Sequence, residues 1–134
     1  MESIQQVFDY LKACGPFFLA TMDGDQPRVR PFQAIAIFED KFYILTKNFK
    51  QVFAQMQQNP KIEITATASD RSWMRLTATA IVDDRAKARE YMIEQNPQLK
   101  PRFAADDGTT EVLYLRYATA TFCALGSEPK TVKF

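Results

Sequence analysis

Four residues in the first half of the chain carry groups that bind phosphate. Arg28 and Arg30 lie two positions apart in a segment with strand character, and Thr46 and Lys50 lie where the next strand turns into a helix. Guanidinium groups bind phosphate through paired hydrogen bonds, and an ammonium adds a compact point charge. A helix N-terminus adds free backbone N–H groups. The sequence therefore predicts a phosphate pocket without a glycine-rich loop, suited to a phosphorylated cofactor held by strands.

Each of these residues also has an ordinary structural explanation. Two arginines on one face of a strand can pair with acidic neighbours, although the flanking Pro27 and Pro31 restrict the backbone and favour a shaped site. Lysines on a short helix, here Lys47 and Lys50, are commonly solvated surface residues. Thr46 can be an ordinary strand-end residue. At the level of single residues both interpretations stay open.

The composition limits the classes of function open to the chain. At 134 residues it is expected to form one domain, residues 1–134. A net charge of +1 gives no polyanion-binding surface and argues against nucleic acid as a partner. The absence of histidine excludes a Ser-His-Asp triad, a His-based zinc site and a His-ligated haem. Any chemistry must then come from a bound cofactor or from Lys, Tyr, Cys and carboxylate side chains, and no metal site is expected.

Nothing in the sequence suggests targeting or a membrane. Residues 1–6 lack the charged and apolar regions of a signal peptide, and no apolar run approaches the roughly 20 residues that a membrane span needs. Cys14 and Cys123 lie far apart and show no CxxC or metal-ligand spacing, so both are expected to be structural. A reduced, cytoplasmic protein with no membrane partner is the expectation.

The first half is expected to hold a helix followed by three strands. Helical spacing covers residues 4–11, and Gly15-Pro16 closes that helix. Strands are expected at residues 17–22, 28–38 and 42–46, with the short connections of an antiparallel meander.

A second helix is expected next, with Asn48 placed to cap it and Asn59-Pro60 to end it. Its buried stripe is expected to be core packing and consists of Phe49, Val52, Phe53 and Met56.

The second half is expected to contain mostly strands. Residues 61–68 and 73–82 alternate between apolar and polar positions, and Met74, Leu76, Ala78, Ala80 and Val82 form the apolar side of the second. Asp83-Asp84 is expected to open a third helix, closed by Asn96-Pro97, with a buried stripe of Ala88, Tyr91 and Met92. Residues 98–110 are expected to form a helical turn and a loop, and residues 131–134 a short edge strand.

The last long strand, expected at residues 111–125, is apolar on both faces. Such a strand needs a cover on its second face. A small barrel has one interior, so a second subunit in a homodimer is the expected cover. The whole pattern predicts a mainly β (α+β) fold, an antiparallel split β-barrel of Greek-key type with peripheral helices.

A series of short motifs extends this prediction. In chain order they are Phe18-Leu19-Ala20-Thr21, Gly24, Pro27-Arg28-Val29-Arg30-Pro31-Phe32, Tyr43-Ile44-Leu45-Thr46, Lys50, Asn59-Pro60, Ile62-Glu63-Ile64 and Trp73-Met74-Arg75. Their order and spacing resemble the pyridoxamine 5′-phosphate oxidase-like family of FMN-binding split barrels, in its short single-domain members. The resemblance runs from about residue 5 to the C-terminal Thr131-Val132-Lys133-Phe134.

The resemblance implies a homodimer with two FMN sites at the subunit interface. It places Arg28, Val29 and Arg30 along the flavin and its phosphate, with Val29 contributing backbone contacts. Thr46 and Lys50 are then phosphate ligands, and Trp73 and Arg75 approach the flavin from a neighbouring strand or subunit, unless they form a cation–π pair between strands. The full expected cofactor-binding set is Arg28, Val29, Arg30, Thr46, Lys47, Asn48, Lys50, Gln51, Trp73 and Arg75.

One departure from the family bears on the reaction. Pyridoxamine-phosphate oxidases hold their substrate with a C-terminal Arg-x-His segment, which this chain lacks, so that oxidation is not expected. The resemblance implies instead an FMN-dependent oxidoreductase that passes electrons from a reduced nicotinamide, or another donor, to a small acceptor such as a quinone, a nitro compound or a second flavin. No catalytic side chain can be named. The alternatives are a non-catalytic flavin-binding or sensor protein and a relative that binds the deazaflavin F420.

Overall fold

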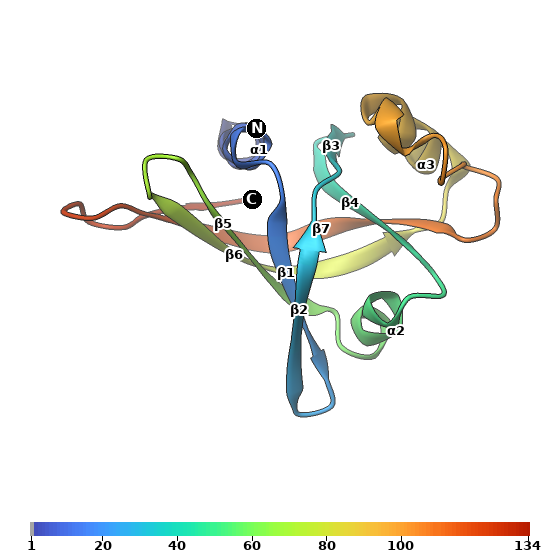
Figure 1. The fold of residues 1–134 in the computed structure, drawn as a ribbon, viewed down its shortest axis with the longest axis horizontal. Coiled ribbons are helices and arrows are strands. Elements are labelled where there is room, and N and C mark those ends of the chain that lie inside the picture. Colours follow the sequence, from blue (N-terminus) through green and yellow to red (C-terminus); the bar gives the residue numbers. More distant parts are fainter. Residues whose placement is uncertain (1) are drawn as a thin grey trace.

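The computed structural model describes residues 2–134 as one curled antiparallel sheet with three α-helices around it (Figure 1). The helices are α1 (Glu2–Cys14), α2 (Gln51–Gln58) and α3 (Ala86–Gln95), and a 3₁₀ turn, η1 (Pro97–Leu99), follows α3. The strands are β1 (Phe17–Asp23), β2 (Gln26–Phe32), β3 (Ile35–Phe38), β4 (Lys41–Lys47), β5 (Lys61–Thr67), β6 (Trp73–Asp83), β7 (Thr110–Cys123) and β8 (Lys130–Lys133).

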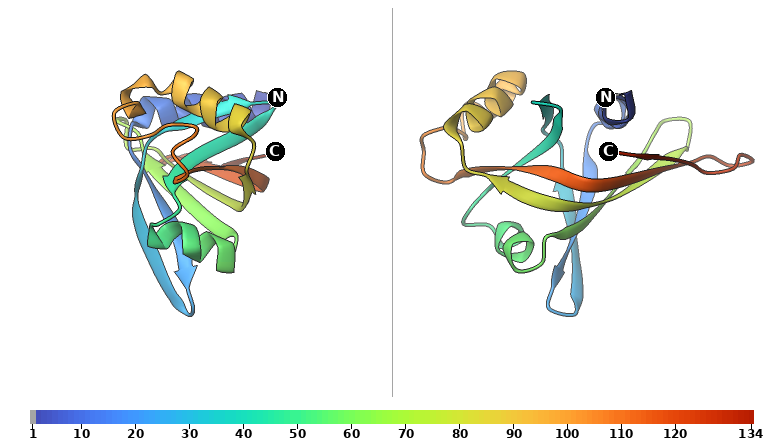
Figure 2. Two further views of the ribbon diagram at one scale, coloured as in Figure 1. Left: turned by 90° about the vertical axis from the view of Figure 1, so that its right-hand side faces the viewer. Right: turned by 180° about the vertical axis from the view of Figure 1, so that it is seen from behind.

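The order of strands gives the barrel its split. Neighbours in the sheet run β2-β1-β5-β6-β7-β4-β3, with β8 added beside β7. The two ends of this path, β2 and β3, are joined by residues 33 and 34 only, so the sheet curls until its ends meet at that connection. In all the views, α1 and α3 lie at one end of the curled sheet and α2 at the other (Figure 2). The predicted mainly β, antiparallel split barrel is confirmed.

The interior follows from the alternation of apolar residues in the strands. The inward positions of β5 (Ile62, Ile64, Ala66) are buried as predicted. The helix α1 ends as predicted, because Gly15 adopts a φ of +85° and its N–H donates to the Leu11 carbonyl at 3.1 Å. Within residues 2–134 no helix is both long and apolar enough to cross a bilayer.

The prediction of one strand over residues 28–38 is wrong. The chain forms two strands there, and they lie at opposite ends of the sheet: β2 pairs with β1, and β3 pairs with β4. The antiparallel pairings of the predicted meander, β1 with β2 and β3 with β4, are present, but they do not form one continuous meander because β2 and β3 do not pair with each other. Pro27 and Pro31 explain part of this arrangement. Proline donates no N–H and is tolerated at the sheet edge that β2 occupies.

The predicted start of the second helix is also wrong. Lys50 occupies the N-cap position of α2 and makes no capping bond with its side chain. Asn48 instead donates to the Gly108 carbonyl and to the Glu111 carboxylate, both at 3.0 Å. Phe49 lies before the helix with 71% of its surface exposed, so it is not part of the buried stripe, while the rest of that stripe is buried as predicted.

A bulge in β7 changes which of its side chains face inward. The pairing with β6 shifts between Thr77 and Thr79, opposite Tyr117, whose φ is +54°. As a result Leu115 on one side of the bulge and Ala118 on the other both face the interior. Near its end β6 also departs from the predicted alternation, because Val82 is partly exposed and Asp83 is buried.

The second face of β7 has a cover within the same chain. Val112 packs with Ala88, Met92 and Ile93 of α3 in a second core cluster. The expectation that a second subunit covers this face is therefore wrong for the first half of β7. Ala88 and Met92 are buried as predicted, and Tyr91 is partly buried against the same cluster. At the bulge, Tyr117 is exposed.

Candidate functional site

A pocket of about 210 Å³ lies in the split between the two ends of the sheet. It is lined by β2 and the connection after it, by the end of β4, by the start of α2, and by the segment that follows α3. Its lining residues are Arg30, Pro31, Phe32, Gln33, Ala34, Leu45, Thr46, Lys50, Val52, Leu99 and Phe103. Three of the four residues from which the phosphate pocket was predicted thus share one cavity.

The pairing of β1 with β2 determines which way the arginines point. Leu19 lies opposite Arg30 and Thr21 opposite Arg28, and residues opposite each other on paired strands share a face of the sheet. Leu19 and Thr21 are buried. Arg28 and Arg30 therefore project from the inner face of β2, toward α2, whereas Val29 projects from the other face and is 67% exposed.

Arg30 is a partly buried cation held by neutral oxygens. Its Nη1 donates to the Leu19 carbonyl at 3.2 Å and to Thr21 Oγ1 at 2.8 Å, and its Nη2 donates to Gln55 Oε1 at 2.8 Å. None of the ion pairs among the described side chains, residues 3–134, involves Arg30. Burial, and then the charge of Arg28, lowers the pKa of this guanidinium, which nevertheless stays charged. A partly desolvated charge without a counter-ion is unfavourable, and an anionic partner would compensate it.

Thr46 and Lys50 add further donors to the same pocket. Thr46 is buried at the end of β4, and Lys50 is exposed at the N-cap of α2, whose first turn has no acidic residue. In the part of the chain that the structure describes, no hydrogen bond of the Thr46 hydroxyl and no ion pair of Lys50 is found. The first N–H groups of a helix also lack partners within it. The pocket therefore gathers several donors and two cations around one space.

Arg28 and Gln51 lie beside this pocket rather than in it. The Arg28 Nε lies 3.2 Å from the Asp23 carboxylate, and both side chains are about half exposed. Together with Gln51 and Gln55, this pair lines a neighbouring pocket of about 420 Å³ between the β1–β2 hairpin and α2. Because the charge of Arg28 is already paired, its attraction for an anion is weaker than that of Arg30.

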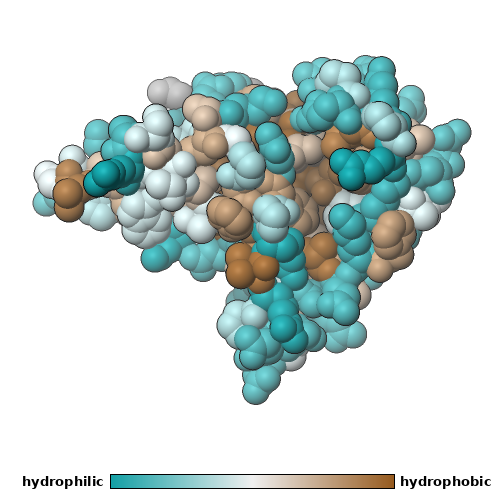
Figure 3. Space-filling model, in the orientation of Figure 1, coloured by the Kyte–Doolittle hydropathy of each residue, from teal (hydrophilic) through white to brown (hydrophobic). Residues whose placement is uncertain are grey.

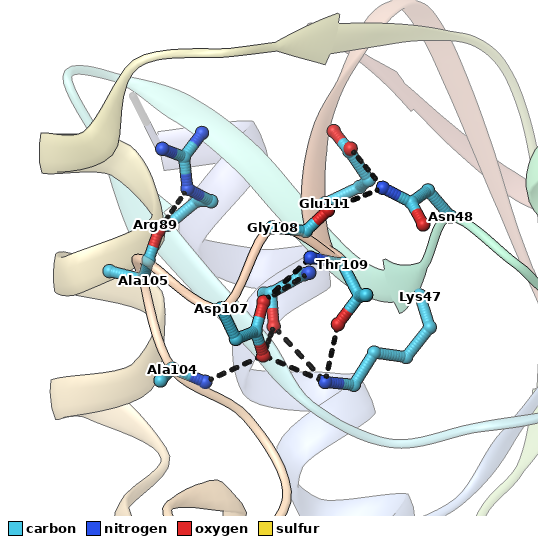
Figure 4. Close-up of polar contacts among 10 residues, drawn as sticks. Lys47, Asn48, Arg89, Ala104, Ala105, Asp107, Gly108, Thr109 and Glu111 are labelled. Carbon is cyan, nitrogen blue, oxygen red and sulfur yellow. Dashed lines mark hydrogen bonds and ion pairs between the residues drawn. The ribbon is translucent and has the colours of Figure 1, made fainter.

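Lys47 points away from the pocket into a network of its own (Figure 4). Its Nζ donates to Asp107 Oδ2 at 2.8 Å and to the hydroxyls of Thr109 and Thr110 at 3.1 and 3.4 Å, and it lies 4.5 Å from the Phe103 ring centre. Partial burial opposes the charged form of Asp107, but hydrogen bonds from Lys47 and from backbone N–H groups outweigh it, so the pKa of Asp107 lies well below its ordinary value. Lys47 supports the pocket wall without lining it.

The side chain of Asn48 forms hydrogen bonds in the same region as Lys47. Its amide donates to the Gly108 carbonyl and to Glu111, which ties the start of α2 to the loop before β7 (Figure 4). Neither Lys47 nor Asn48 is brought together with Arg30, although both were expected in the cofactor-binding set.

Trp73 and Arg75 lie on β6 and do not line the Arg30 pocket. Arg75 forms an ion pair with Glu63 at 3.1 Å, and its guanidinium carbon lies 5.3 Å from the Trp73 ring centre. Trp73 lines a separate pocket with Tyr10 and Phe122. Within one chain these two residues form a cation–π pair along the single strand β6, rather than between strands as the alternative interpretation had it.

Sequence reasoning missed four residues that shape the site. Thr21 and Gln55 hold Arg30, and Leu99 and Phe103 form the apolar wall of the pocket. Two signals were available: Thr21 is a polar residue at an inward position of an alternating strand, and Gln55 is a polar residue beside the buried stripe of its helix. Leu99 and Phe103 belong to a segment without periodicity, so nothing in the sequence placed them.

The lining of the pocket also limits what this chain can do by itself. It contains no carboxylate, cysteine or tyrosine, and the chain has no histidine, so among the usual acid–base side chains the lining offers Lys50 alone. Among the side chains that the structure describes, from residue 3 onward, no group of three or more acidic or cysteine side chains could hold a metal ion. The arrangement can bind an anionic ligand and orient it, and the chemistry would have to come from that ligand.

Comparison with known proteins places the chain among similar folds. The family model described as pyridoxamine 5′-phosphate oxidase matches residues 3–124. A NimC/NimA family protein from Clostridium acetobutylicum is 41% identical, with a TM-score of 0.97 over 99% of this chain and 93% of that one. General stress protein 26 from Bacillus anthracis is 12% identical with a TM-score of 0.78 over the whole of both chains. An F420 reductase is 14% identical with a TM-score of 0.63 over 81% of this chain and 90% of that one. No curated protein sequence matches the chain.

Proposed function

The chain belongs to the pyridoxamine 5′-phosphate oxidase family, and from that premise we propose that it binds FMN and passes electrons from a reduced nicotinamide, or another donor, to a small acceptor. The observation that carries the proposal is the state of Arg30. A partly buried guanidinium with neutral partners only, beside a hydroxyl, an ammonium and a helix N-terminus, has the charge and the donors that a phosphate monoester requires.

The residues of the pocket divide the binding of FMN between them. Arg30 would take the phosphate with its remaining donors, Thr46 would donate its hydroxyl, and Lys50 would add charge from the rim. The resemblance to the family adds the backbone of Val29 as a contact for the flavin. Arg28 and Gln51, in the neighbouring pocket, would contribute at longer range.

When bound, FMN supplies electron transfer through its isoalloxazine ring. The chain's own residues bind and orient it, and Leu99, Phe103 and Phe32 exclude water from the apolar side of the pocket. A lining whose charged side chains are the cations Arg30 and Lys50 suits a chain that binds the cofactor and leaves the chemistry to it. It also suits the alternative, a flavin-binding carrier or sensor without turnover, so the two must be separated by measurement.

Two related activities fit the pocket less well. F420 carries an acidic tail beyond its phosphate, which calls for further cations, whereas the walls around Arg30 and Lys50 are apolar or uncharged. One structural neighbour is named an F420 reductase, but at 14% identity it supports the fold alone. We do not propose oxidation of pyridoxamine phosphate, because residues 1–134 contain no Arg-x-His segment of the kind with which those oxidases hold their substrate.

We also propose a homodimer with FMN at its interface, in the cytoplasm. Exposed apolar side chains support the dimer: Phe18 and Val29 are 47% and 67% exposed. Hydrophobic side chains gather at the centre of the face in Figure 3, over β1 and β2, whereas the tip of that hairpin is hydrophilic. A groove of about 530 Å³ lies between β1, β5 and β6, with Tyr117 at its edge. Contiguous exposed apolar surface of this kind is typical of interfaces.

The visible absorption spectrum of the protein, purified without added cofactor, tests the proposal. We expect flavin bands and, after denaturation, release of FMN identified by mass. A colourless protein that does not bind added FMN would contradict the proposed cofactor, and release of F420 would replace it. Turnover of NADH or NADPH with a quinone or nitro acceptor then separates an oxidoreductase from a carrier, which would bind FMN without turnover.

A further inference from the structure

We infer that Gln55 and Thr21 are positioning residues that hold the Arg30 guanidinium by neutral acceptors, so that its charge stays available to an anionic ligand. This inference rests on the proposed phosphate pocket. It concerns two residues outside the expected cofactor-binding set, and it explains why a polar side chain is buried on α2 at all.

The three side chains form a closed ring of hydrogen bonds. Arg30 Nη1 donates to Thr21 Oγ1 and Nη2 to Gln55 Oε1, both at 2.8 Å, and the Thr21 hydroxyl donates to the same Gln55 oxygen at 2.5 Å. Only one orientation of the Thr21 hydroxyl hydrogen satisfies this ring. Thr21 is 2% exposed and Gln55 is 7% exposed, and buried, fully satisfied networks hold their members rigidly.

The ring leaves part of the guanidinium free. A guanidinium has five N–H donors, and the Leu19 carbonyl, Thr21 and Gln55 use three of them. The remaining donors, on Nε and Nη2, are not used by the ring. Because Arg30 lines the pocket while its other edge is fixed to β1 and α2, the free donors are held in place before a ligand arrives. Such preorganisation reduces the entropy that binding costs.

The chemical identity of residue 55 then decides the charge of the pocket. A carboxylate at this position could accept the same hydrogen bonds from Arg30 and Thr21 but would neutralise the guanidinium. The amide accepts them without a charge, so it orients Arg30 and leaves its positive charge unpaired. Gln55 differs from Glu by one terminal group, which makes the substitution a direct test of charge at nearly constant shape.

The test compares FMN with riboflavin, which lacks the phosphate. Gln55→Glu is expected to weaken FMN binding about 30-fold through the lost net charge, with riboflavin affinity changed less than about twofold. Gln55→Leu and Thr21→Val are expected to weaken FMN binding about fivefold by loosening Arg30, and Thr21→Ser, which keeps the hydroxyl, should restore it. Gln57→Glu, on the same helix but exposed, is the matched control. There the ratio of the two affinities should stay within about twofold of the wild-type ratio.

The outcomes separate this inference from the proposal beneath it. If the wild-type protein shows no preference for FMN over riboflavin, the phosphate pocket itself is wrong and the inference falls with it. If wild type prefers FMN but Gln55→Glu keeps that preference, or loses FMN and riboflavin equally, the pocket stands and the positioning role is overturned. A purely structural role would lower both affinities together. Circular dichroism and thermal unfolding check that each variant has folded. If Gln55→Leu does not fold, Gln55→Glu and Thr21→Ser still test the inference, because both keep the hydrogen-bond acceptors of the ring.

Discussion

Two basic side chains near the split of the barrel, Lys47 and Arg30, meet their surroundings in opposite ways. Lys47 is buried and forms an ion pair with Asp107 at 2.8 Å, supported by two hydroxyls and an aromatic ring. Arg30 is partly buried, and its hydrogen-bond partners are all neutral: the Leu19 and Arg28 carbonyls, a hydroxyl and an amide. One cation is neutralised within the chain, and the other is oriented without being neutralised.

Lys47 lies outside the Arg30 pocket because successive side chains of β4 alternate between the two faces of the sheet. Thr46 and Lys47 are consecutive residues of β4, so they point to opposite faces. Thr46 faces the pocket that contains Arg30, whereas Lys47 faces the loop before β7. Nearness to a turn in the sequence therefore does not identify a phosphate ligand. The two cations differ in their partners, since Lys47 pairs with a carboxylate and Arg30 has neutral partners.

The largest effect is expected for Lys47→Met. Its removal leaves the Asp107 carboxylate without its cation, and the free energy of unfolding should fall by about 2–3 kcal/mol, somewhat less than for a fully buried pair. Urea denaturation measures it, with exposed Lys100→Met as the control, expected to change stability by less than about 0.5 kcal/mol. The FMN-to-riboflavin affinity ratio should not change. A lost preference for FMN in folded Lys47→Met would place Lys47 in the phosphate site after all.

Arg30→Met is expected to do the reverse of Lys47→Met, since it should change FMN affinity strongly and the free energy of unfolding little. It should weaken FMN binding about 30- to 100-fold, as the loss of a charge-assisted pair to phosphate does, and leave riboflavin binding nearly unchanged. Stability should change by less than about 1 kcal/mol, because the lost hydrogen bonds are offset by removal of an unpaired charge. Titration of both ligands by fluorescence measures the ratio.

Arg28→Met is the matched control for Arg30→Met, since it lies on the same face of β2, two residues away, and is already paired with Asp23. Its effect on FMN should stay within about threefold. Equal effects at the two positions would mean that pairing with a carboxylate does not decide which arginine binds the ligand.

The Lys47–Asp107 cluster should also give stability a pH dependence that the Arg30 cluster lacks. The pKa of Asp107 is depressed in the folded chain, so the native state holds fewer protons there than the unfolded state. The resulting stability is present above the unfolded pKa of about 3.9 and is lost as pH falls toward the folded value.

The comparison of wild type with Asp107→Asn isolates this contribution from that of other carboxylates. We expect wild type to be more stable by about 1–2 kcal/mol at pH 7, with the difference shrinking below about pH 4. Urea denaturation at a series of pH values measures it. A difference that stays constant from pH 7 to pH 3 would show that the charge of Asp107 contributes nothing.

The fold and the site could be predicted from the sequence to different degrees. The alternation in β5 and the stop signal at Gly15 depend on neighbours in the chain, and both were predicted correctly. The break after β2 was missed, because it depends on where the curled sheet closes, which is a long-range property. The position of Phe49 was missed for a related reason: the helix begins later, since Asn48 bonds to a loop about 60 residues away.

The candidate site likewise depends on long-range contacts that the local sequence does not reveal. Arg30, Thr46 and Lys50 were grouped correctly by residue type and spacing, and the structure brings them to one pocket. Lys47 carries the same ammonium group as Lys50 and was expected in the same cofactor-binding set, yet its partner, Asp107, lies in a loop that no periodicity locates. Local patterns identify groups that can bind phosphate. Only the fold determines which of them are already neutralised.

The smallest effect on FMN binding is expected for Lys50→Ala, and its size shows whether an exposed cation contributes as much as the partly buried Arg30. Lys50 resembles Arg30 in having no ion pair among the described residues, and resembles an ordinary surface lysine in its exposure. If an unpaired charge counts fully only when it is partly desolvated, Lys50→Ala should weaken FMN binding about three- to fivefold at low salt, and the effect should fade near 0.5 M salt. The effect of Arg30→Met should persist at that salt concentration, because buried pairs are screened much less. Titration of FMN at two salt concentrations measures both. A loss at Lys50 as large and as resistant to salt as the loss at Arg30 would show that the number of cations, rather than the burial of one of them, sets the affinity of this pocket.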